Sequence, residues 1–117
     1  MTNALTPAAF ALLLALTEGD RHGYGLIADV EHLTGGHLVL GPGTLYRTLQ
    51  RLRVEGLVEE VEIDEQAVRA DRRAERRRSY RITPTGLAAV RQEARRLATL
   101  VDSDTARKLL RADRKDN

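Results

Sequence analysis

Apolar residues recur at every third or fourth position in several parts of the chain, which is the spacing of one face of an α-helix. The clearest case follows Pro42, where Leu45, Leu49 and Leu52 fall on one side. Pro42 suits the first helical position because its missing N–H is not needed there, and Gly41 can serve as the N-cap. The pattern predicts a helix that buries its leucines and exposes a polar, basic face.

The chain also opens with a helical pattern. Thr6 is suited to the N-cap and Pro7 to the first helical position, and residues 8–17 are almost wholly apolar. A helix that is apolar all round is buried on most sides. In a chain this short, we expect a second subunit to cover part of it, through Phe10 and Leu13.

A second helix is predicted from His22 to about Leu33, with its apolar residues in core spacing. The other two histidines form no ligand spacing with His22 and there is no cysteine, so a helix-end hydrogen bond suits His22 better than a metal site. Tyr24 is expected in the core or on a phosphate. Residues 37–40 then form an extended connector or a short strand.

Alternation of apolar and polar residues predicts two strands, at 57–63 and 79–83. In the first, Val61 and Ile63 alternate with glutamates. Residues 64–78 lie between the strands and have no apolar period, so we expect them to form a long hairpin tip that is mobile in the free protein.

A last helix is predicted to start at Thr83 and Pro84. Its apolar residues recur at three and four positions, which is the seam of paired helices; they are Leu87, Val90, Ala94, Leu97 and Val101. We expect this seam to form a dimer interface with the first helix. The helix should break at 102–104, a short helix should follow at 105–111, and residues 112–117 should fray.

Composition adds an uneven distribution of charge. The 117 residues are 42% hydrophobic and 31% charged, which is typical of one globular domain, and the net charge is only +2. Between Arg69 and Arg81, however, there are seven arginines and only two acidic residues. Arginine presents a planar fork suited to phosphate and guanine, so the sequence favours local nucleic-acid contacts over a generally basic surface.

The order helix, helix, helix, strand, strand, helix predicts a mainly α fold with a small β-hairpin. This is a winged helix-turn-helix over residues 1–83 with a C-terminal dimerisation helix and frayed tail over 84–117, in one structural unit. The third helix would then enter the major groove of double-stranded DNA, or line its edge, with Thr44, Tyr46, Arg47 and Gln50, of which Arg47 is the best candidate to bind guanine. Arg51, together with Tyr46, is better suited to binding phosphate. The hairpin tip, or wing, would contact the DNA backbone or minor groove with Arg72, Arg73, Arg76, Arg77 and Arg78.

Several motifs in this order resemble the PadR-like transcriptional regulators. They are His22-Gly23-Tyr24, Pro42-Gly43-Thr44-Leu45-Tyr46, Leu49 with Leu52, Glu55-Gly56-Leu57, and Tyr80-Arg81-Ile82-Thr83-Pro84-Thr85-Gly86. Gly41 departs from the serine common before Pro-Gly-Thr, and the short C-terminal part fits the subfamily with a single long helix there. The resemblance implies a cytoplasmic, homodimeric repressor that releases DNA on meeting a small-molecule effector or another signal.

Other classes of function are less well supported. We find no nucleophile–base pair, no metal-ligand spacing and no phosphate-binding glycine loop, so we expect neither an enzyme nor a cofactor. The apolar run at 10–16 is too short to span a membrane. The alternative that stays open is a winged-helix interaction or dimerisation module that does not bind DNA, which the low net charge and Glu59, Glu60 and Glu62 favour.

Overall fold

The computed structural model describes residues 5–61 and 78–115. Its elements follow in the order α1 (Pro7–Leu16), β1 (Arg21–His22), α2 (Gly23–Leu33), α3 (Pro42–Val54), β2 (Val58–Val61), β3 (Ser79–Ile82), α5 (Pro84–Val101) and α6 (Asp104–Lys115). This is the predicted mainly α winged helix-turn-helix, with one short strand more than the sequence indicated.

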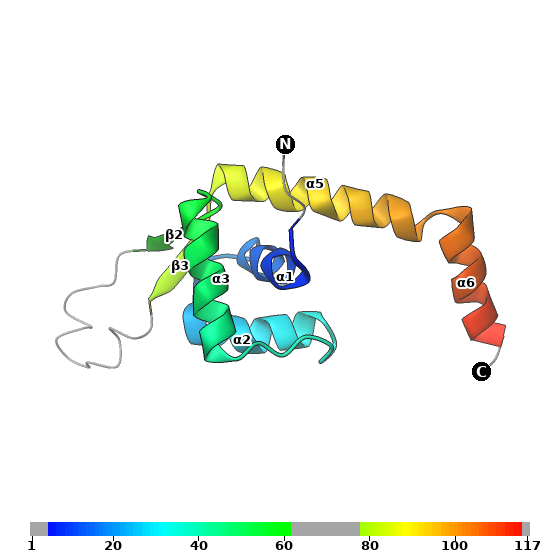
Figure 1. Cartoon of the computed structure of the whole chain (residues 1–117), viewed down its shortest axis with the longest axis horizontal. Helices are drawn as coiled ribbons and strands as arrows, with labels where there is room; N and C mark the ends of the chain where they lie inside the picture. Colours follow the sequence, from blue (N-terminus) through cyan, green and yellow to red (C-terminus); the bar gives the residue numbers. More distant parts are fainter. Residues whose placement is uncertain (1–4, 62–77, 116–117) are drawn as a thin grey trace.

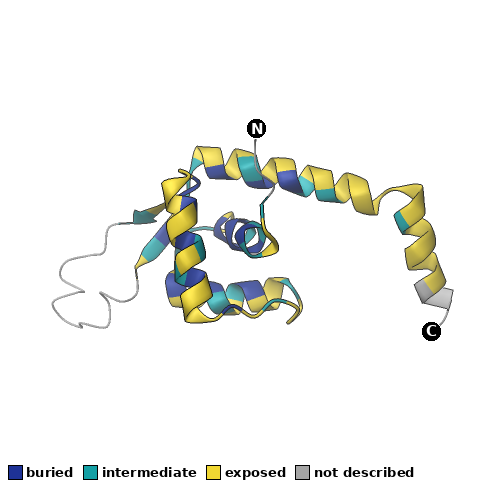
Figure 2. Ribbon diagram, in the orientation of Figure 1, coloured by how far each residue is buried: buried dark blue, intermediate teal, exposed yellow. Residues whose placement is uncertain are grey.

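The first helix, α1, is the centre of the core. It lies between α2, α3 and α5 and also contacts β3 (Figure 1). Leu12 and Leu13 are fully buried, and the dark band of Figure 2 covers much of the helix. The chain itself therefore supplies most of the burial that we expected from a second subunit, although Phe10 remains half-buried at the edge of the core.

The predicted helix starts are confirmed. The Thr6 hydroxyl accepts a hydrogen bond from the Ala9 N–H at 3.1 Å, and the Thr83 hydroxyl accepts one from the Gly86 N–H at 3.0 Å. These bonds satisfy amide donors that the first turn of a helix leaves without a partner. Gly41 is the N-cap of α3 but offers no side chain, so α3 begins without such a bond.

The sheet is antiparallel, with β3 in the middle and the strand order β1-β3-β2. Its third strand lies at 21–22. Residues 37–40 are therefore a connector, and the alternative prediction of a short strand there was wrong. The Leu38 N–H donates to the Thr34 hydroxyl at 3.0 Å, which ties this connector back to the end of α2. Arg21 and His22 instead pair with Tyr80 and Ser79.

The start of α5 is pressed against the turn that follows α3. Gly56 has a φ of 76°, a left-handed conformation that suits glycine, and brings the chain round to Leu57. The Leu57 carbonyl accepts a hydrogen bond from the Thr83 N–H at 3.0 Å, and a Cβ atom at Gly86 would lie 2.0 Å from that oxygen. Only glycine therefore allows α5 to approach the turn this closely.

The C-terminal helices α5 and α6 form an arm, whose far end extends away from the core (Figure 1). The predicted break after Val101 is confirmed, with Asp102 as the C-cap of α5. The following helix is longer than expected, because α6 continues to Lys115 where we predicted fraying from Ala112. In the part of the chain that the structure describes, no helix is both long and apolar enough to cross a membrane.

Candidate nucleic-acid interface

The outward face of α3 carries most of the predicted recognition residues. Leu45, Leu49 and Leu52 lie on the inner face with 0–2% of their surface exposed. The opposite face is exposed and carries Thr44, Arg47, Gln50 and Arg51. It is polar and positively charged, and the helix holds no acid along its length.

Among the described residues, the two predicted arginines of this face contact their own helix and its C-cap. The Arg47 Nε donates to the Gly43 carbonyl at 3.3 Å, and Arg51 forms an exposed ion pair with Glu55 at 3.5 Å across one helical turn. Exposed pairs of this kind contribute little to stability. Both guanidiniums can therefore exchange these contacts for phosphates or base edges at small cost.

Tyr46 lies differently from the other predicted recognition residues. It is half-buried and packs against the core, and its ring stands edge-on to Tyr24 with centroids 6.3 Å apart. A Cβ atom at Gly23 would come within 2.8 Å of its hydroxyl, so Gly23 makes room for this ring. Burial raises the pKa of the Tyr46 phenol, which stays neutral at physiological pH. The ring thus joins α3 to the start of α2, a role that the sequence did not reveal.

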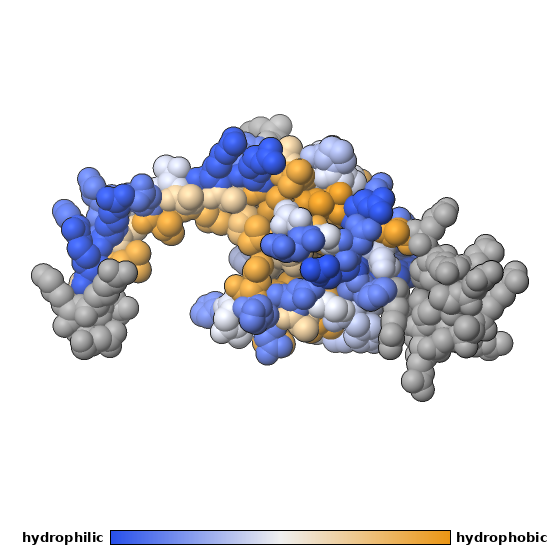
Figure 3. Space-filling model, turned by 180° about the vertical axis from the view of Figure 1, so that it is seen from behind, coloured by the Kyte–Doolittle hydropathy of each residue, from blue (hydrophilic) through white to orange (hydrophobic). Residues whose placement is uncertain are grey.

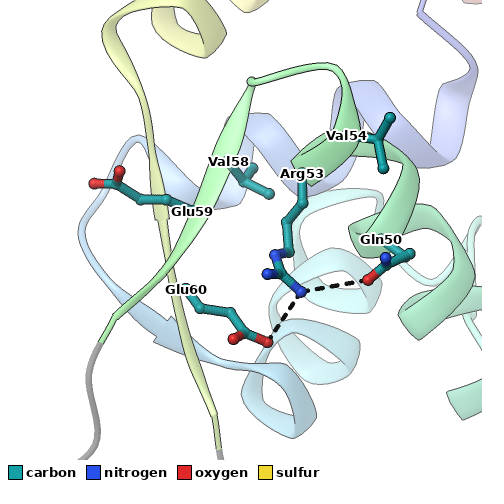
Figure 4. A pocket seen from close by; sticks show the side chains of 6 residues that line it. All are labelled: Gln50, Arg53, Val54, Val58, Glu59 and Glu60. Carbon is teal, nitrogen blue, oxygen red and sulfur yellow. Dashed lines mark hydrogen bonds and ion pairs between the residues drawn. The ribbon is translucent and has the colours of Figure 1, made fainter.

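Arg53 was not among our predicted site residues, yet it joins α3 to the sheet. Its Nη1 atom donates to Gln50 Oε1 and to Glu60 Oε1, each at 3.3 Å (Figure 4). Arg78 donates its own Nη1 to the same oxygen of Glu60 at 3.2 Å. The side chains therefore form a continuous polar chain from the recognition helix to the base of the hairpin.

Only one of the predicted wing residues can be placed. Arg72, Arg73, Arg76 and Arg77 lie outside the described residues, as does the rest of the expected mobile tip apart from Arg78. Arg78 immediately precedes β3, is exposed and is paired with Glu60. Its position beside α3 brings the base of the predicted wing to the recognition surface.

A second polar cluster holds the far side of the sheet. Arg81 forms two hydrogen bonds with the carboxylate of Asp20, at 3.1 and 2.9 Å, and these bonds lower the pKa of Asp20. On the same side, the Ser79 hydroxyl lies 3.0 Å from His22 Nδ1, and His22 is the N-cap of α2 without a side-chain cap bond. His22 is thus at the helix end, as predicted, but its imidazole contacts β3. Within residues 5–61 and 78–115, no cluster of three His, Asp or Glu side chains could hold a metal ion.

The arm carries most of the apolar residues that we predicted for dimerisation, but some of the predicted residues are buried within the single chain. Val90 and Leu13 are buried in the core of the single chain, at 3% and 0% exposed, so neither has surface for a second chain and both leave the predicted interface. Leu87 and Val101 are exposed, and Ala94 and Leu97 are half-buried. Figure 3 shows apolar side chains along the inner side of α5 and α6.

An apolar groove lies beside this arm. It has a volume of about 550 Å³ and runs between α1, the end of α2 and α5. Its lining includes Phe10, Leu14, Leu33, Leu38 and Leu97. Glu93 of α5 also lines the groove; it is buried and accepts two hydrogen bonds from Arg96, at 2.5 and 3.1 Å, which lower the pKa of Glu93. Of the predicted seam, Leu97 thus lines this groove, whereas Val90 lies in the core.

Comparison with known proteins identifies relatives over most of this fold. The model of the transcriptional regulator PadR-like family matches residues 12–92. A transcriptional regulator of Mycobacterium tuberculosis is 41% identical over 80% of this chain and 79% of its own length. An uncharacterized protein in a transposon of Streptomyces fradiae is 34% identical over 80% of this chain. That protein is longer, and the matched part is only 24% of its length.

A solved structure has a similar fold. A transcriptional regulator from Clostridium thermocellum superposes with a TM-score of 0.64 at 27% identity, covering 80% of this chain and 82% of its own.

Proposed function

Since this chain belongs to the PadR-like family of transcriptional regulators, we propose that it binds double-stranded DNA sequence-specifically as a homodimer and acts in the cytoplasm as a repressor. Members of this family are regulators and not enzymes. In the proposed mechanism a small molecule or another signal lowers the affinity for DNA, so that transcription resumes when the signal is present.

One observation carries the proposal, namely the free outer face of α3. Its inner leucines are almost completely buried, so the helix is rigidly mounted, while Arg47, Gln50 and Arg51 are exposed together. An α-helix fits the major groove of B-DNA, where side chains reach base edges. A module that only bound other proteins would not need an acid-free row of guanidinium and amide groups on this face.

The arginines in and beside this face have different proposed parts. Arg47 is suited to the O6 and N7 atoms of guanine, which arginine binds with two parallel hydrogen bonds. Arg51, nearer the end of the helix, and Arg78 at the base of the wing are suited to phosphates, which position the helix without reading sequence. Tyr46 supports the helix from within, because its ring packs against Tyr24 and over Gly23 at the start of α2.

The DNA upstream of the protein's own gene gives the first test. We expect the purified protein to protect an inverted repeat there, because a dimer reads two half-sites about one helical turn apart. Nuclease footprinting on this segment and on an equally long coding segment measures the effect. Equal affinity for both segments over a range of salt concentrations would refute sequence-specific binding.

The proposed homodimer rests on the exposed apolar surface of the arm. Leu100, Val101, Leu109 and Leu110 are 58–74% exposed, which is unusual for a cluster of large apolar side chains. They lie on the arm that also forms one wall of the apolar groove. Packing of two arms against each other would remove this surface from water and fix the spacing of the two recognition helices.

Sedimentation or light scattering at micromolar concentration is therefore expected to give twice the 13.0 kDa chain mass. Replacing both Leu109 and Leu110 with glutamate should shift the protein toward the monomer, because a charge buried in the interface has no partner. Val54, which is 79% exposed on α3, provides a matched control as Val54→Glu. A monomeric mass for the unaltered protein would contradict the dimer and the palindromic operator together.

A further inference from the structure

The junction between α3 and the sheet contains an acid in the middle of a basic surface. Glu60 lies on β2 opposite the buried Tyr80, and its side chain points toward α3 (Figure 4). One oxygen of its carboxylate accepts hydrogen bonds from both Arg53 and Arg78. An acid here repels DNA phosphates, so a purely electrostatic surface would be better without it.

The strand fixes where this carboxylate lies. Successive residues of a strand alternate between the two faces of the sheet, so Val58 and Glu60 share the face that packs on α3. Val58 is 3% exposed, and the Glu60 side chain is 27% exposed. The neighbouring Glu59 points away from Arg53 (Figure 4) and forms an ion pair with Arg81 at 4.0 Å.

Arg53 connects Glu60 to Gln50, a residue on the exposed face of α3. A guanidinium has hydrogen-bond donors and no acceptor, so the Gln50 side chain must turn its amide oxygen, and not its NH₂ group, toward Arg53. The Arg53 Nη1 to Gln50 Oε1 distance is 3.3 Å. The NH₂ group of Gln50 is consequently left without Arg53 as a partner and remains available as a donor.

We propose that Glu60 is a positioning residue for DNA reading: through Arg53 it sets the orientation of the Gln50 amide, and so the base that Gln50 selects. This inference rests on the proposed function. An amide that presents NH₂ donates to the acceptors of guanine, adenine or thymine in the major groove. Cytosine offers only its N4 donor there, so Gln50 in this orientation rejects cytosine at one position of each half-site.

The test measures base preference at every operator position by competition with all four base pairs. The position read by Gln50 is the one whose preference is lost in Gln50→Ala. At that position we expect Arg53→Met to reduce the discrimination against cytosine by about fivefold, the low end of the effect of one mismatched base contact. Glu60→Gln, which keeps the shape but not the charge, should act in the same direction, and preferences elsewhere should stay as they are.

Glu59→Gln is the matched control, because it removes the same charge from the next residue of the same strand. It should leave the cytosine discrimination intact. The same loss in Glu59→Gln, or an equal gain in affinity for operator and scrambled DNA in Glu60→Gln, would show a general charge effect and overturn the proposal. A uniform loss of affinity with unchanged base preference would assign Glu60 a structural role alone and also overturn it.

A measurement on the free protein separates this inference from the DNA-binding proposal. The side-chain ¹⁵N–¹H₂ signals of Gln50 should show restricted motion in the unaltered protein and faster motion in Arg53→Met and Glu60→Gln, with thermal unfolding confirming that both variants fold. Equal mobility in all three proteins would refute the positioning role even if DNA binding were specific. Restricted motion in a protein without preference for any duplex would instead refute the proposed function.

Discussion

Replacement of Gly86 with alanine is expected to lower the free energy of unfolding by about 3 kcal/mol or more, at the upper end of what overpacking costs. The added Cβ atom would lie 2.0 Å from the Leu57 carbonyl oxygen and 2.9 Å from Ile82 Cγ1. The oxygen belongs to the backbone and already accepts a hydrogen bond from the Thr83 N–H. The clash can be relieved only if α5 moves away from the turn after α3, which opens the core around Val90.

Urea unfolding followed by circular dichroism measures this change, and Gly25→Ala is the matched control. Gly25 lies in the first turn of α2, and nothing within 4 Å would meet an added Cβ atom. Alanine there should stabilise the protein by up to about 1 kcal/mol, because it restricts the unfolded chain. If both variants were as stable as the unaltered protein, the close approach of α5 to Leu57 would be incorrect.

Arg47→Ala is expected to weaken binding to the operator by about 1–3 kcal/mol, the discrimination that one arginine–guanine pair provides. Affinity for scrambled duplex should fall much less, because Arg47 is assigned to a base and not to a phosphate. The loss should also be confined to one base position in each half-site, where the variant accepts substitutions that the unaltered protein rejects. Fluorescence anisotropy on operator and scrambled duplexes across a salt series measures both affinities.

Arg91→Ala serves as the control for Arg47→Ala. It removes the same charge from an exposed position on α5, outside the recognition helix. It should leave the ratio of the two affinities unchanged. Should Arg47→Ala lower both affinities equally, Arg47 would be a phosphate contact, and the assignment of base reading to this residue would be wrong.

Local signals made most of the fold predictable from the sequence. Thr6-Pro7, Gly41-Pro42 and Thr83-Pro84 mark helix starts through the chemistry of adjacent residues, and each of the three helices begins at its proline. The spacing of leucines in α3 likewise identified its buried face correctly. These features depend on neighbours in the chain, which a sequence displays directly.

Features that depend on distant partners could not be predicted in this way. The strand β1 has only two residues and exists because β3, nearly 60 positions later, offers its backbone. Tyr46 was assigned to the groove because its position on α3 is near the polar face, yet space over Gly23 turns the ring inward. The pairing of Glu60 with Arg53 and Arg78 likewise requires the hairpin register, which the sequence left open.

The C-terminal seam shows a different limit. A repeat of apolar residues at three and four positions indicates that a helix face is buried, but it does not say by what. Val90 packs into the chain's own core, whereas Val101 on the same helix is 58% exposed. The same spacing of apolar residues therefore continues from the part of α5 that packs on the core to the part that is exposed. Where one part gives way to the other depends on how far the core extends along α5.

The central place of α1 has a consequence for how the protein is made. This helix leaves the ribosome before the elements that cover it, and one of its faces is covered by α5, about 80 residues later in the chain. During synthesis its leucines therefore stay without their final covering until α5 has left the ribosome. A messenger truncated before Pro84 would yield a polypeptide that cannot close its core, and such a product is a substrate for chaperones and proteases.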